Sequence, residues 1–352
     1  MINKIIYLDR HLKSVTGGHK YNDAFEEYIE SLSRIKIQST IPCASKYKGI
    51  KKIFSPFVEI KHIKAFNRKS LIIFGDTSYK YHLLLLFLTK YFTRAKTTMI
   101  VHHFPFIGQK GLRWGLNKWL MCKYTSMVDS IIVPSPFTLD VAKELFPQSK
   151  IFYVPLPFKQ KFKQSENYEI GNFLYVGTVE ERKGLSYLID AIALLKNKCE
   201  VKLNIVGKVV EDSYYEKLQS QIANLGLSNN VYFHGRVSDE QLEEYYQRAE
   251  IFTFPSLLEG YGIVLIESFN NGLPIICFNN TAMPYTVKHG INGLIAKNQD
   301  TIDLANMIEQ LSGNIQLRGK LQVGIKNTVL QLKTIDDFKQ AINIFYQYVC
   351  HE

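Results

Sequence analysis

The sequence predicts an α/β protein made of two doubly wound domains, each a parallel sheet covered by helices. Short apolar segments rich in β-branched residues alternate with helical patterns along the chain, which is typical of βαβ units. The alternation runs in two series, separated by the polar segment PLPFKQKFKQSENYEIGN at 155–172, which has prolines at its start. A length of 352 residues also suits two domains better than one core.

The first series predicts an N-terminal Rossmann-like domain over residues 1–157, followed by a linker at 158–171. Its strands are expected at 5–8, 35–40, 71–76, 98–104, 130–135 and 151–155, with helices at 19–33, 80–93, 112–126 and 137–146. The stretch 41–66 is basic and fits neither pattern.

The second series predicts a C-terminal Rossmann-like domain over residues 172–334. In its first helix, Leu185, Leu188, Ile189, Ile192 and Leu195 recur at helical spacing and are expected to pack on the sheet. The amphipathic segment 335–352 is predicted to form a helix that packs back on the N-terminal domain. Because ligands of doubly wound sheets bind beyond the carboxyl ends of the strands, we expect the site in a cleft between the two domains.

Composition narrows the class of protein. The five cysteines lie far apart without a Cys-x-x-Cys pair, so neither a disulfide framework nor a zinc site is indicated, and a reducing cytosol suits them. The N-terminus MINKIIYLDR lacks the features of a signal peptide. The most apolar later segment, HLLLLFLTKYF at 82–92, is too short to span a bilayer.

The formal net charge of +11 is concentrated in the first part of the chain. Residues 1–150 carry 24 Lys and Arg against 10 Asp and Glu, whereas residues 151–352 carry 19 against 22. Such a basic half is compatible with nucleic acid, an anionic membrane surface, an acidic substrate or simply a solvated surface.

Three turns after predicted strands are candidates for ligand contact. VGTVEERKG at 176–184 leaves a strand at Gly177 and carries Arg182 and Lys183 just before a helix, where free N–H groups and the helix dipole favour a phosphate. VGK at 206–208 and FHGR at 233–236 also end strands in glycine, which allows close backbone approach to a flat ligand.

The segment FPSLLEGYGIVLIE, at 254–267, holds two carboxylates, Glu259 and Glu267, around a Gly-Tyr-Gly turn. If a helix begins near Gly262, a diphosphate could lie against its free N–H groups. The glutamates could be an acid/base pair of a glycoside hydrolase, metal ligands, a helix cap, or acceptors of hydrogen bonds from sugar and ribose hydroxyls.

In this order and spacing, VGTVEERKG, LNIVG, VYFHGRV, FPSLLEGYGIVLIE, NGLPII and HGINGLIA resemble the retaining glycosyltransferases of family 4, which have the GT-B fold. The resemblance covers about 172–312. It implies an N-terminal domain that binds the acceptor and a C-terminal domain that binds a nucleotide-sugar, with the C-terminal helix crossing back.

The resemblance also implies residue roles. Glu267 would hold the ribose and Glu259 the transferred sugar, while Arg182 and Lys183 would neutralise the diphosphate. The backbone around Gly177 and at the Gly-Tyr-Gly turn would approach the donor, and Arg236 would lie beside the base. In the N-terminal domain, TGGHKYN at 16–22 resembles the family's glycine-rich loop, and MIVHHF has a histidine expected to face the donor sugar. The implied positions are Gly17, Gly18, His102, Gly177, Arg236, Gly260, Tyr261 and Gly262, with His103 as the alternative to His102.

Three departures from the family concern the donor. Thr178 stands where many members have arginine, which leaves the phosphates to Arg182 and Lys183. Tyr285, in AMPYTV, replaces a usual glutamate, and YVPLPFK lacks the customary Asn-Gly. These changes put the donor's identity in question more than the reaction.

The resemblance implies transfer of a hexose from a UDP- or GDP-sugar to an acceptor hydroxyl, with retention and without a metal or other cofactor. The expected acceptor is a glycan or lipid-linked glycan in bacterial surface polysaccharide synthesis. The expected location is the cytoplasm, with peripheral attachment to the inner face of the membrane, and no nucleic-acid partner is expected. The rival interpretations are an inactive glycosyltransferase-like partner subunit, another enzyme with a two-lobed fold, and a nucleic-acid-binding protein that uses the basic half.

Overall fold

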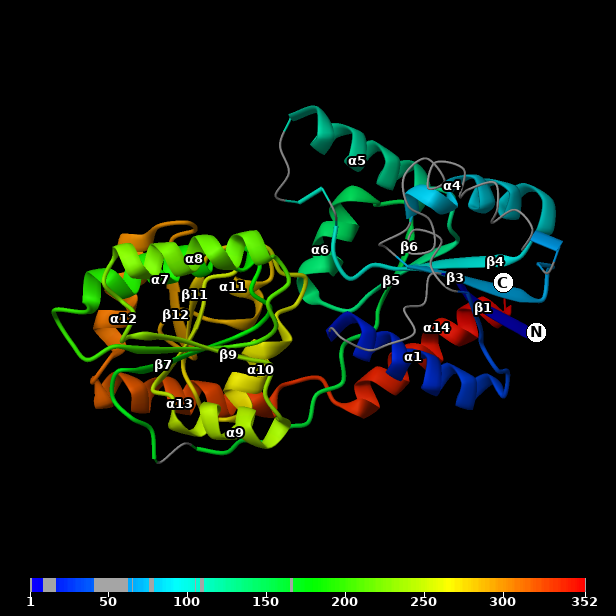
Figure 1. Cartoon of the computed structure of the whole chain (residues 1–352). Coiled ribbons are helices and arrows are strands. Elements are labelled where there is room, and N and C mark those ends of the chain that lie inside the picture. Colours follow the sequence, from blue (N-terminus) through cyan, green and yellow to red (C-terminus); the bar gives the residue numbers. More distant parts are fainter. Residues whose placement is uncertain are drawn as a thin grey trace. The chain divides into compact units, whose positions relative to one another are not determined.

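The computed structural model describes residues 2–8, 17–40, 63–64, 66–75, 79–104, 106–107, 111–164 and 167–351 (Figure 1). The chain divides into two compact units, Met1–Phe158 with Lys333–Glu352, and Lys159–Leu332. Each unit contains one six-stranded sheet, in which all neighbouring strands pair in parallel. The predicted α/β class with two Rossmann-like domains is confirmed. Most of the basic stretch at 41–66, which fitted neither the strand nor the helix pattern, lies outside the described residues.

The first sheet has the strand order β2-β1-β3-β4-β5-β6. Its strands are β1 (Lys4–Leu8), β2 (Gln38–Thr40), β3 (Ser70–Gly75), β4 (Lys96–Ile100), β5 (Ser130–Val133) and β6 (Lys150–Tyr153). Its helices are α1 (Gly17–Ser33), α4 (Tyr79–Leu88), the π-helical turn η3 (Thr89–Thr93), α5 (Gly111–Thr125), α6 (Pro136–Leu145) and α14 (Ile335–His351).

Alternate residues of these strands face opposite layers, as the two-residue period of a strand requires. Ile6, Ile72, Met99 and Ile131 belong to the core beneath α4, α5 and α6. On the other face lie α1 and α14 (Figure 1). Ser135 begins α6, where its Oγ accepts a hydrogen bond from the Thr138 N–H at 3.0 Å, so its role is that of an N-cap.

Helix α14 belongs to the first unit although it follows the whole second unit in the sequence. The ring of Phe338 in α14 lies edge-on to the ring of Tyr21 in α1, and the two ring centroids are 5.9 Å apart. Phe345 contacts both Phe25 of α1 and Phe152 of β6, at centroid distances of 6.2 and 5.4 Å. Four buried positions spaced along one face of α14 therefore close the apolar layer on α1.

The second sheet has the order β12-β11-β10-β7-β8-β9. Its strands are β7 (Asn172–Val176), β8 (Lys202–Val206), β9 (Val231–Gly235), β10 (Ile251–Phe254), β11 (Ile275–Phe278) and β12 (Gly293–Ala296). Its helices are α7 (Leu185–Leu195), α8 (Asp212–Asn224), α9 (Asp239–Arg248), α10 (Ile263–Asn270), α11 (Met283–Thr286), α12 (Thr301–Leu311) and α13 (Ile315–Leu330), with a 3-10 turn η4 (Glu181–Lys183) before α7. The apolar stripe expected on α7 is fully buried.

The segment expected to be a linker, 158–171, differs from that expectation because residues after Phe158 belong to the second unit. Lys163 N donates to Asn270 O at 2.7 Å, and Glu169 N donates to Arg248 O at 3.0 Å. Gly171 N donates to the buried carboxylate of Glu250 at 2.8 Å. These described residues are therefore held by the second unit and are not a free connection.

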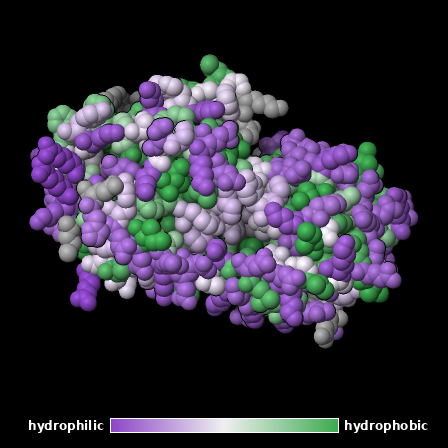
Figure 2. Space-filling model, turned by 180° about the vertical axis from the view of Figure 1, so that it is seen from behind, coloured by the Kyte–Doolittle hydropathy of each residue, from purple (hydrophilic) through white to green (hydrophobic). Residues whose placement is uncertain are grey.

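No helix among the described residues combines the length and the apolar character that a membrane span requires. Hydrophilic side chains cover most of the face seen in Figure 2, with separate hydrophobic patches between them.

Candidate donor-binding site

The loops that follow β7 and β10 meet at the carboxyl-end edge of the second sheet, because these two strands are parallel neighbours. Leu257 N donates to Arg182 O at 2.8 Å and joins the two loops. Gly184 ends the η4 turn with φ +69°, and a Cβ built on it would lie 2.1 Å from the Pro255 carbonyl oxygen. Only glycine fits this position without displacing backbone, so Gly184 fixes the Arg182-Lys183 pair against the loop after β10.

Glu259 is the centre of the polar contacts in these two loops. Its Oε1 accepts hydrogen bonds from the Lys183 ammonium, from Ser256 Oγ at 2.9 Å and from Arg182 Nη1 at 3.4 Å. The side chains of Lys183 and Glu259 are only 11% and 12% exposed, so this ion pair is largely shielded from solvent. Among the described residues, the hydrogen bonds to this carboxylate from Lys183, Ser256 and Arg182 all reach Oε1.

The backbone of Glu259 is held by Thr281, a residue that sequence reasoning missed. Glu259 N donates to Thr281 Oγ1 at 3.1 Å, and Thr281 Oγ1 donates to Asn280 Oδ1 at 3.0 Å. Thr281 has φ +41°, which is unusual for a β-branched residue. No motif marks Thr281, since its role arises only where the turn after β11 meets the loop after β10.

Arg182 is also held by Glu180, which accepts from Arg182 Nη2 at 2.7 Å. Glu180 Oε1 accepts in addition from Thr178 Oγ1 at 2.6 Å. Thr178, which stands where many family members have arginine, therefore has a role in the structure. Its hydroxyl orients the carboxylate of Glu180, and that carboxylate positions the guanidinium of Arg182. Burial, and then the negative charges of Glu259 and Glu180, raise the pKa of Tyr175 at the end of β7.

Helix α10 begins directly after the Gly-Tyr-Gly turn. Gly262 is its N-cap residue with φ +80°, and no side chain caps its N-terminus. Gly260 and Tyr261 lie in the loop between Glu259 and this N-cap. The first turn of α10 therefore begins with free backbone N–H groups, a few residues after Glu259 in the sequence. Such groups at a helix start favour an anion.

Glu267 lies on α10, one turn after its start, and its contacts differ from those of Glu259. Tyr246 of α9 donates its hydroxyl to Glu267 Oε2 at 3.3 Å. Burial, and then the charge of Glu267, raise the pKa of Tyr246 well above its ordinary value. The two glutamates are thus oriented by different groups.

The other predicted residues of the second unit lie at the ends of strands. Gly177 follows β7, and its N–H donates to Val206 O at 2.9 Å. Arg236 follows β9 and is exposed. Both lie at the carboxyl-end edge with Lys183 and Glu259, but the structure records no contact that joins Arg236 to them.

In the first unit, Gly17 and Gly18 form the first turn of α1, so the expected glycine loop is the helix start itself. A Cβ built on Gly18 would lie 3.6 Å from the ring of His102, which shows that this glycine faces the histidine. His102 Nε2 is 2.8 Å from Asn22 Oδ1, and its ring lies edge-on to Tyr21 with centroids 5.2 Å apart. Strand β4 ends at Ile100, so His102 and His103 follow the strand and do not belong to its end as expected.

Asn22 was not identified from the sequence, although it lies on the same helix as Gly18, four residues further on. The geometry places His102 with Gly18 and Asn22.

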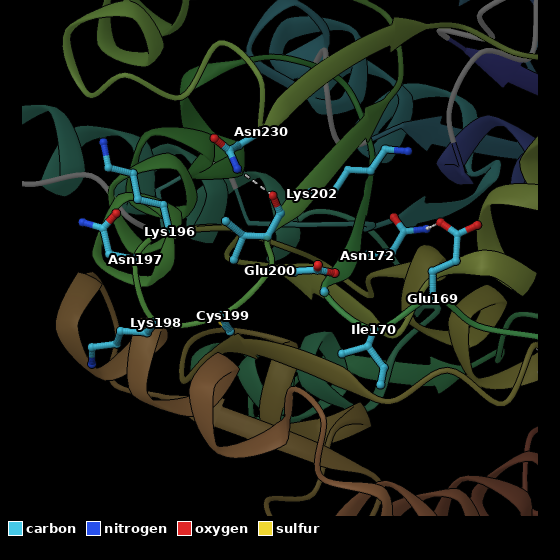
Figure 3. Close-up of a pocket in the computed structure, with 12 residues that line it drawn as sticks. Glu169, Ile170, Asn172, Lys196, Asn197, Lys198, Cys199, Glu200, Lys202 and Asn230 are labelled. Carbon is cyan, nitrogen blue, oxygen red and sulfur yellow. Dashed lines mark hydrogen bonds between the residues drawn. The ribbon is translucent and has the colours of Figure 1, made fainter.

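A hollow of about 670 Å³ lies at the opposite edge of the second sheet (Figure 3). It is lined by residues at the amino ends of β7 and β8, among them Asn172 and Lys202. None of the predicted site residues lines it. Because ligands of doubly wound sheets bind at the carboxyl ends of strands, this hollow does not enter the candidate site.

The fold and these loops together define the class of protein. Sucrose-phosphate synthase from Thermosynechococcus elongatus is similar to the chain with a TM-score of 0.80 at 18% identity, covering 98% of this chain and 99% of that one. The HepE protein of Anabaena, solved with UDP and glucose, gives a TM-score of 0.75 at 18% identity over 98% of this chain and 99% of its own. The chain has the GT-B fold of these glycosyltransferases, as the sequence motifs predict.

Residues 158–327 match the family described as glycosyl transferases group 1. The O-antigen chain mannosyltransferase B of Escherichia coli is 30% identical over 146 residues, which are 41% of this chain and 37% of that protein. An uncharacterized glycosyltransferase of Methanocaldococcus jannaschii is 29% identical over 175 residues, covering 49% of this chain and 44% of that protein. The chain therefore spans less than half the length of these two relatives.

Proposed function

We propose that the protein is a retaining glycosyltransferase that moves a hexose from a UDP- or GDP-sugar to an acceptor hydroxyl. The observation that carries this proposal is the group of Arg182, Lys183 and Glu259 at the carboxyl-end edge of the second sheet, beside the uncapped start of α10. Two cations and a helix N-terminus suit a diphosphate, and two separately oriented carboxylates suit sugar and ribose hydroxyls.

In the proposed reaction, the bond between the anomeric carbon and the diphosphate oxygen breaks, and its electron pair stays on the diphosphate. Lys183 and Arg182 stabilise the negative charge that develops there. The acceptor oxygen attacks the same face of the anomeric carbon, and its proton passes to the departing diphosphate. The carboxylates bind and orient the donor: Glu259 through a sugar hydroxyl and Glu267 through the ribose.

The ion pair between Lys183 and Glu259 gives this site a way to respond to the donor. A diphosphate carries more negative charge than the single carboxylate of Glu259, so its binding draws Lys183 from Glu259 Oε1. Ser256 Oγ and Arg182 Nη1 still donate to that carboxylate, which keeps it in place. The carboxylate then accepts a hydrogen bond from a hydroxyl of the sugar.

Two relatives support the choice of substrates. HepE was solved with UDP, and the Escherichia coli relative is an O-antigen chain mannosyltransferase. For this chain we therefore propose a UDP- or GDP-hexose as the donor. The proposed acceptor is a glycan or lipid-linked glycan in bacterial surface polysaccharide synthesis. We place the reaction on the cytoplasmic side of the membrane, without a metal. His102 of the first unit keeps its predicted role at the donor sugar as a separate proposal.

The proposal is tested by measuring release of UDP or GDP from UDP-glucose, UDP-galactose, UDP-N-acetylglucosamine and GDP-mannose, with and without lipid-linked oligosaccharide from bacterial membranes. We expect one donor to be used, with acceptor-dependent release that survives EDTA and a product whose anomeric configuration by NMR matches the donor. Binding of UDP and GDP by calorimetry is measured in parallel. Absence of both nucleotide binding and turnover would refute the proposal, and binding without turnover would favour the inactive partner subunit.

A further inference from the structure

The outer side of α5 is apolar where a surface helix is usually polar. Leu112, Leu116 and Trp119 fall on one stripe with Lys123, at spacings of four, three and four residues. The three apolar side chains are 92%, 55% and 55% exposed. The opposite side of the same helix is buried, with Met121 and Tyr124 fully enclosed in the core. The outward stripe is therefore additional to the face that holds the helix on the sheet.

The neighbouring segment α4–η3 continues this exposed apolar surface. Phe87, Tyr91 and Phe92 are 46%, 62% and 74% exposed, and the rings of Phe87 and Tyr91 are in contact with centroids 4.7 Å apart. Lys90 Nζ donates to Ser126 O at 3.1 Å, just after the end of α5, so the two segments lie side by side. Both cover the same face of the first sheet (Figure 1). We call the exposed side of α4, η3 and α5 the aromatic surface.

The charge of this region is of one sign. Residues 77–128 contain eight Lys and Arg and no Asp or Glu. Lys90, Arg94 and Lys123 are exposed, and Lys118 Nζ lies 5.0 Å above the ring of Trp114. Exposed Trp, Tyr, Phe and Leu interleaved with cations are the combination found in segments that lie in the interface of an anionic membrane.

We propose that the aromatic surface docks on an anionic lipid bilayer, with the rings and leucines inserted at the headgroup level and the cations on lipid phosphates. This deepens the proposed function by naming the face that would bring a lipid-linked acceptor to the enzyme, yet membrane binding itself can be measured without turnover. A second copy of the chain is a poorer occupant, because a two-fold contact would place Lys90, Arg94 and Lys123 opposite the same cations of the other copy. Nucleic acid would use the cations and rings but would leave the outward leucines against water.

The chain contains two tryptophans, Trp114 and Trp119, and both are on α5. Their fluorescence therefore reports only on the aromatic surface. The full-length protein is mixed with vesicles of phosphatidylcholine alone or with phosphatidylglycerol, and flotation, emission wavelength and quenching by brominated lipid are recorded. We expect flotation with the anionic vesicles, a blue shift, and quenching by bromines placed near the headgroups.

Two variants and one control separate the contributions. We expect the double variant L116S/W119S to lose at least about tenfold in vesicle partition, because apolar insertion is removed. The variant K118E/K123E is expected to lose its preference for anionic lipid. As a matched control, Ile302→Ser removes an aliphatic side chain of the second unit that is 67% exposed, and it should float like the unchanged protein. A cooperative thermal unfolding transition like that of the unchanged protein, measured for every variant, shows that each is folded.

The proposal is overturned if the folded protein fails to float with anionic vesicles or if it floats without a change in tryptophan emission. It is also overturned if L116S/W119S floats as well as the Ile302→Ser control. Displacement of the protein from vesicles by an oligothymidine single strand, without loss in L116S/W119S, would assign the surface to nucleic acid instead. Loss of nucleotide binding in the unchanged protein would refute the proposed function while leaving the vesicle result to stand.

Discussion

Replacing Lys183 with methionine tests the candidate site most directly. The substitution keeps an unbranched side chain of similar length, and its apolar part can still lie beside Phe254, whose ring centroid is 5.2 Å from Lys183 Nζ. What it removes is the cation that pairs with Glu259 and that we assign to the donor's diphosphate. Removal of one such electrostatic donor costs about 100- to 1,000-fold in kcat, or about 3–4 kcal/mol.

The stability cost should be much smaller than this loss of rate. Breaking a buried ion pair costs about 3–5 kcal/mol when the remaining charge has no other partner. Here Glu259 keeps hydrogen bonds from Ser256 Oγ at 2.9 Å and Arg182 Nη1 at 3.4 Å. We therefore expect about 1–2 kcal/mol, within the range for one hydrogen bond to a charged group. For a domain of this size the Tm would fall by about 2–8 °C.

The assay is nucleotide release from the donor that the unchanged protein uses, with calorimetric UDP or GDP binding and thermal unfolding on the same samples. Lys198→Met is the matched control, since Lys198 forms an exposed ion pair with Glu309 in the same unit at 2.8 Å. That control should keep full activity, because an exposed pair contributes little. Lys183→Arg restores the charge and should recover part of the rate.

Two results would refute this reasoning. If Lys183→Met turns over the donor at the rate of Lys198→Met, Lys183 does not stabilise the leaving group. If instead the variant loses activity and unfolds with a loss well above about 3–5 kcal/mol, the role of Lys183 is structural.

Three further predictions concern the second unit. Glu267→Ala should weaken calorimetric UDP or GDP binding by about 10- to 100-fold, the worth of a charge-assisted hydrogen bond, and an unchanged Kd would remove Glu267 from the ribose. Gly184→Ala should destabilise the unit by about 1–3 kcal/mol in urea unfolding, because the new Cβ meets the Pro255 oxygen at φ +69°; equal stability would contradict the geometry. Burial lowers the pKa of His234 below its ordinary 6.5, so the unfolded state binds the proton first and stability is lost as pH falls through this value. His234→Gln, which can still donate to Asn204, should show less acid loss in unfolding measurements; identical pH profiles would reject this assignment.

The edge of the second sheet was predictable because its signals are local. A strand that ends in Val176, followed by a polar turn with Arg182 and Lys183, fixes where two cations emerge. Parallel pairing then brings the turn after β7 to the edge where the loop with Glu259 emerges. Alternation and spacing therefore sufficed to place these turns at the carboxyl ends of parallel strands and to identify their charged residues.

The pairings within that group were not predictable. Glu259 Oε1 accepts from Lys183 and Ser256, and its backbone N–H donates to Thr281, which lies 22 residues further along the chain. Thr281 has a backbone conformation that β-branched residues rarely adopt, so its neighbours in sequence give no sign of it. In the first unit, the contact between His102 and Asn22 spans 80 positions and depends on how α1 lies against β4.

The domain boundary predicted at 157 lies within one residue of the observed one at Phe158, but the expected linker at 158–171 belongs to the second unit. Polarity at 159–171 indicates a surface segment, but it does not say whether backbone groups face water or the next domain. The hydrogen bonds of Lys163, Glu169 and Gly171 to the second unit decide that question. The same limit applies to α5, whose helical pattern is plain in sequence while its outward apolar stripe is not.

The sequence by itself determined the α/β class, the two sheets and the carboxyl-end loops that carry Lys183, Glu259 and Glu267, because periodicity and turn residues act over a few positions. Only the tertiary structure decided which atoms of these residues meet, that His102 faces Gly18, and which side of α5 remains outside the core. Those outcomes depend on packing between segments distant in the chain, where a shift of one helical turn changes every partner and leaves the local pattern unaltered.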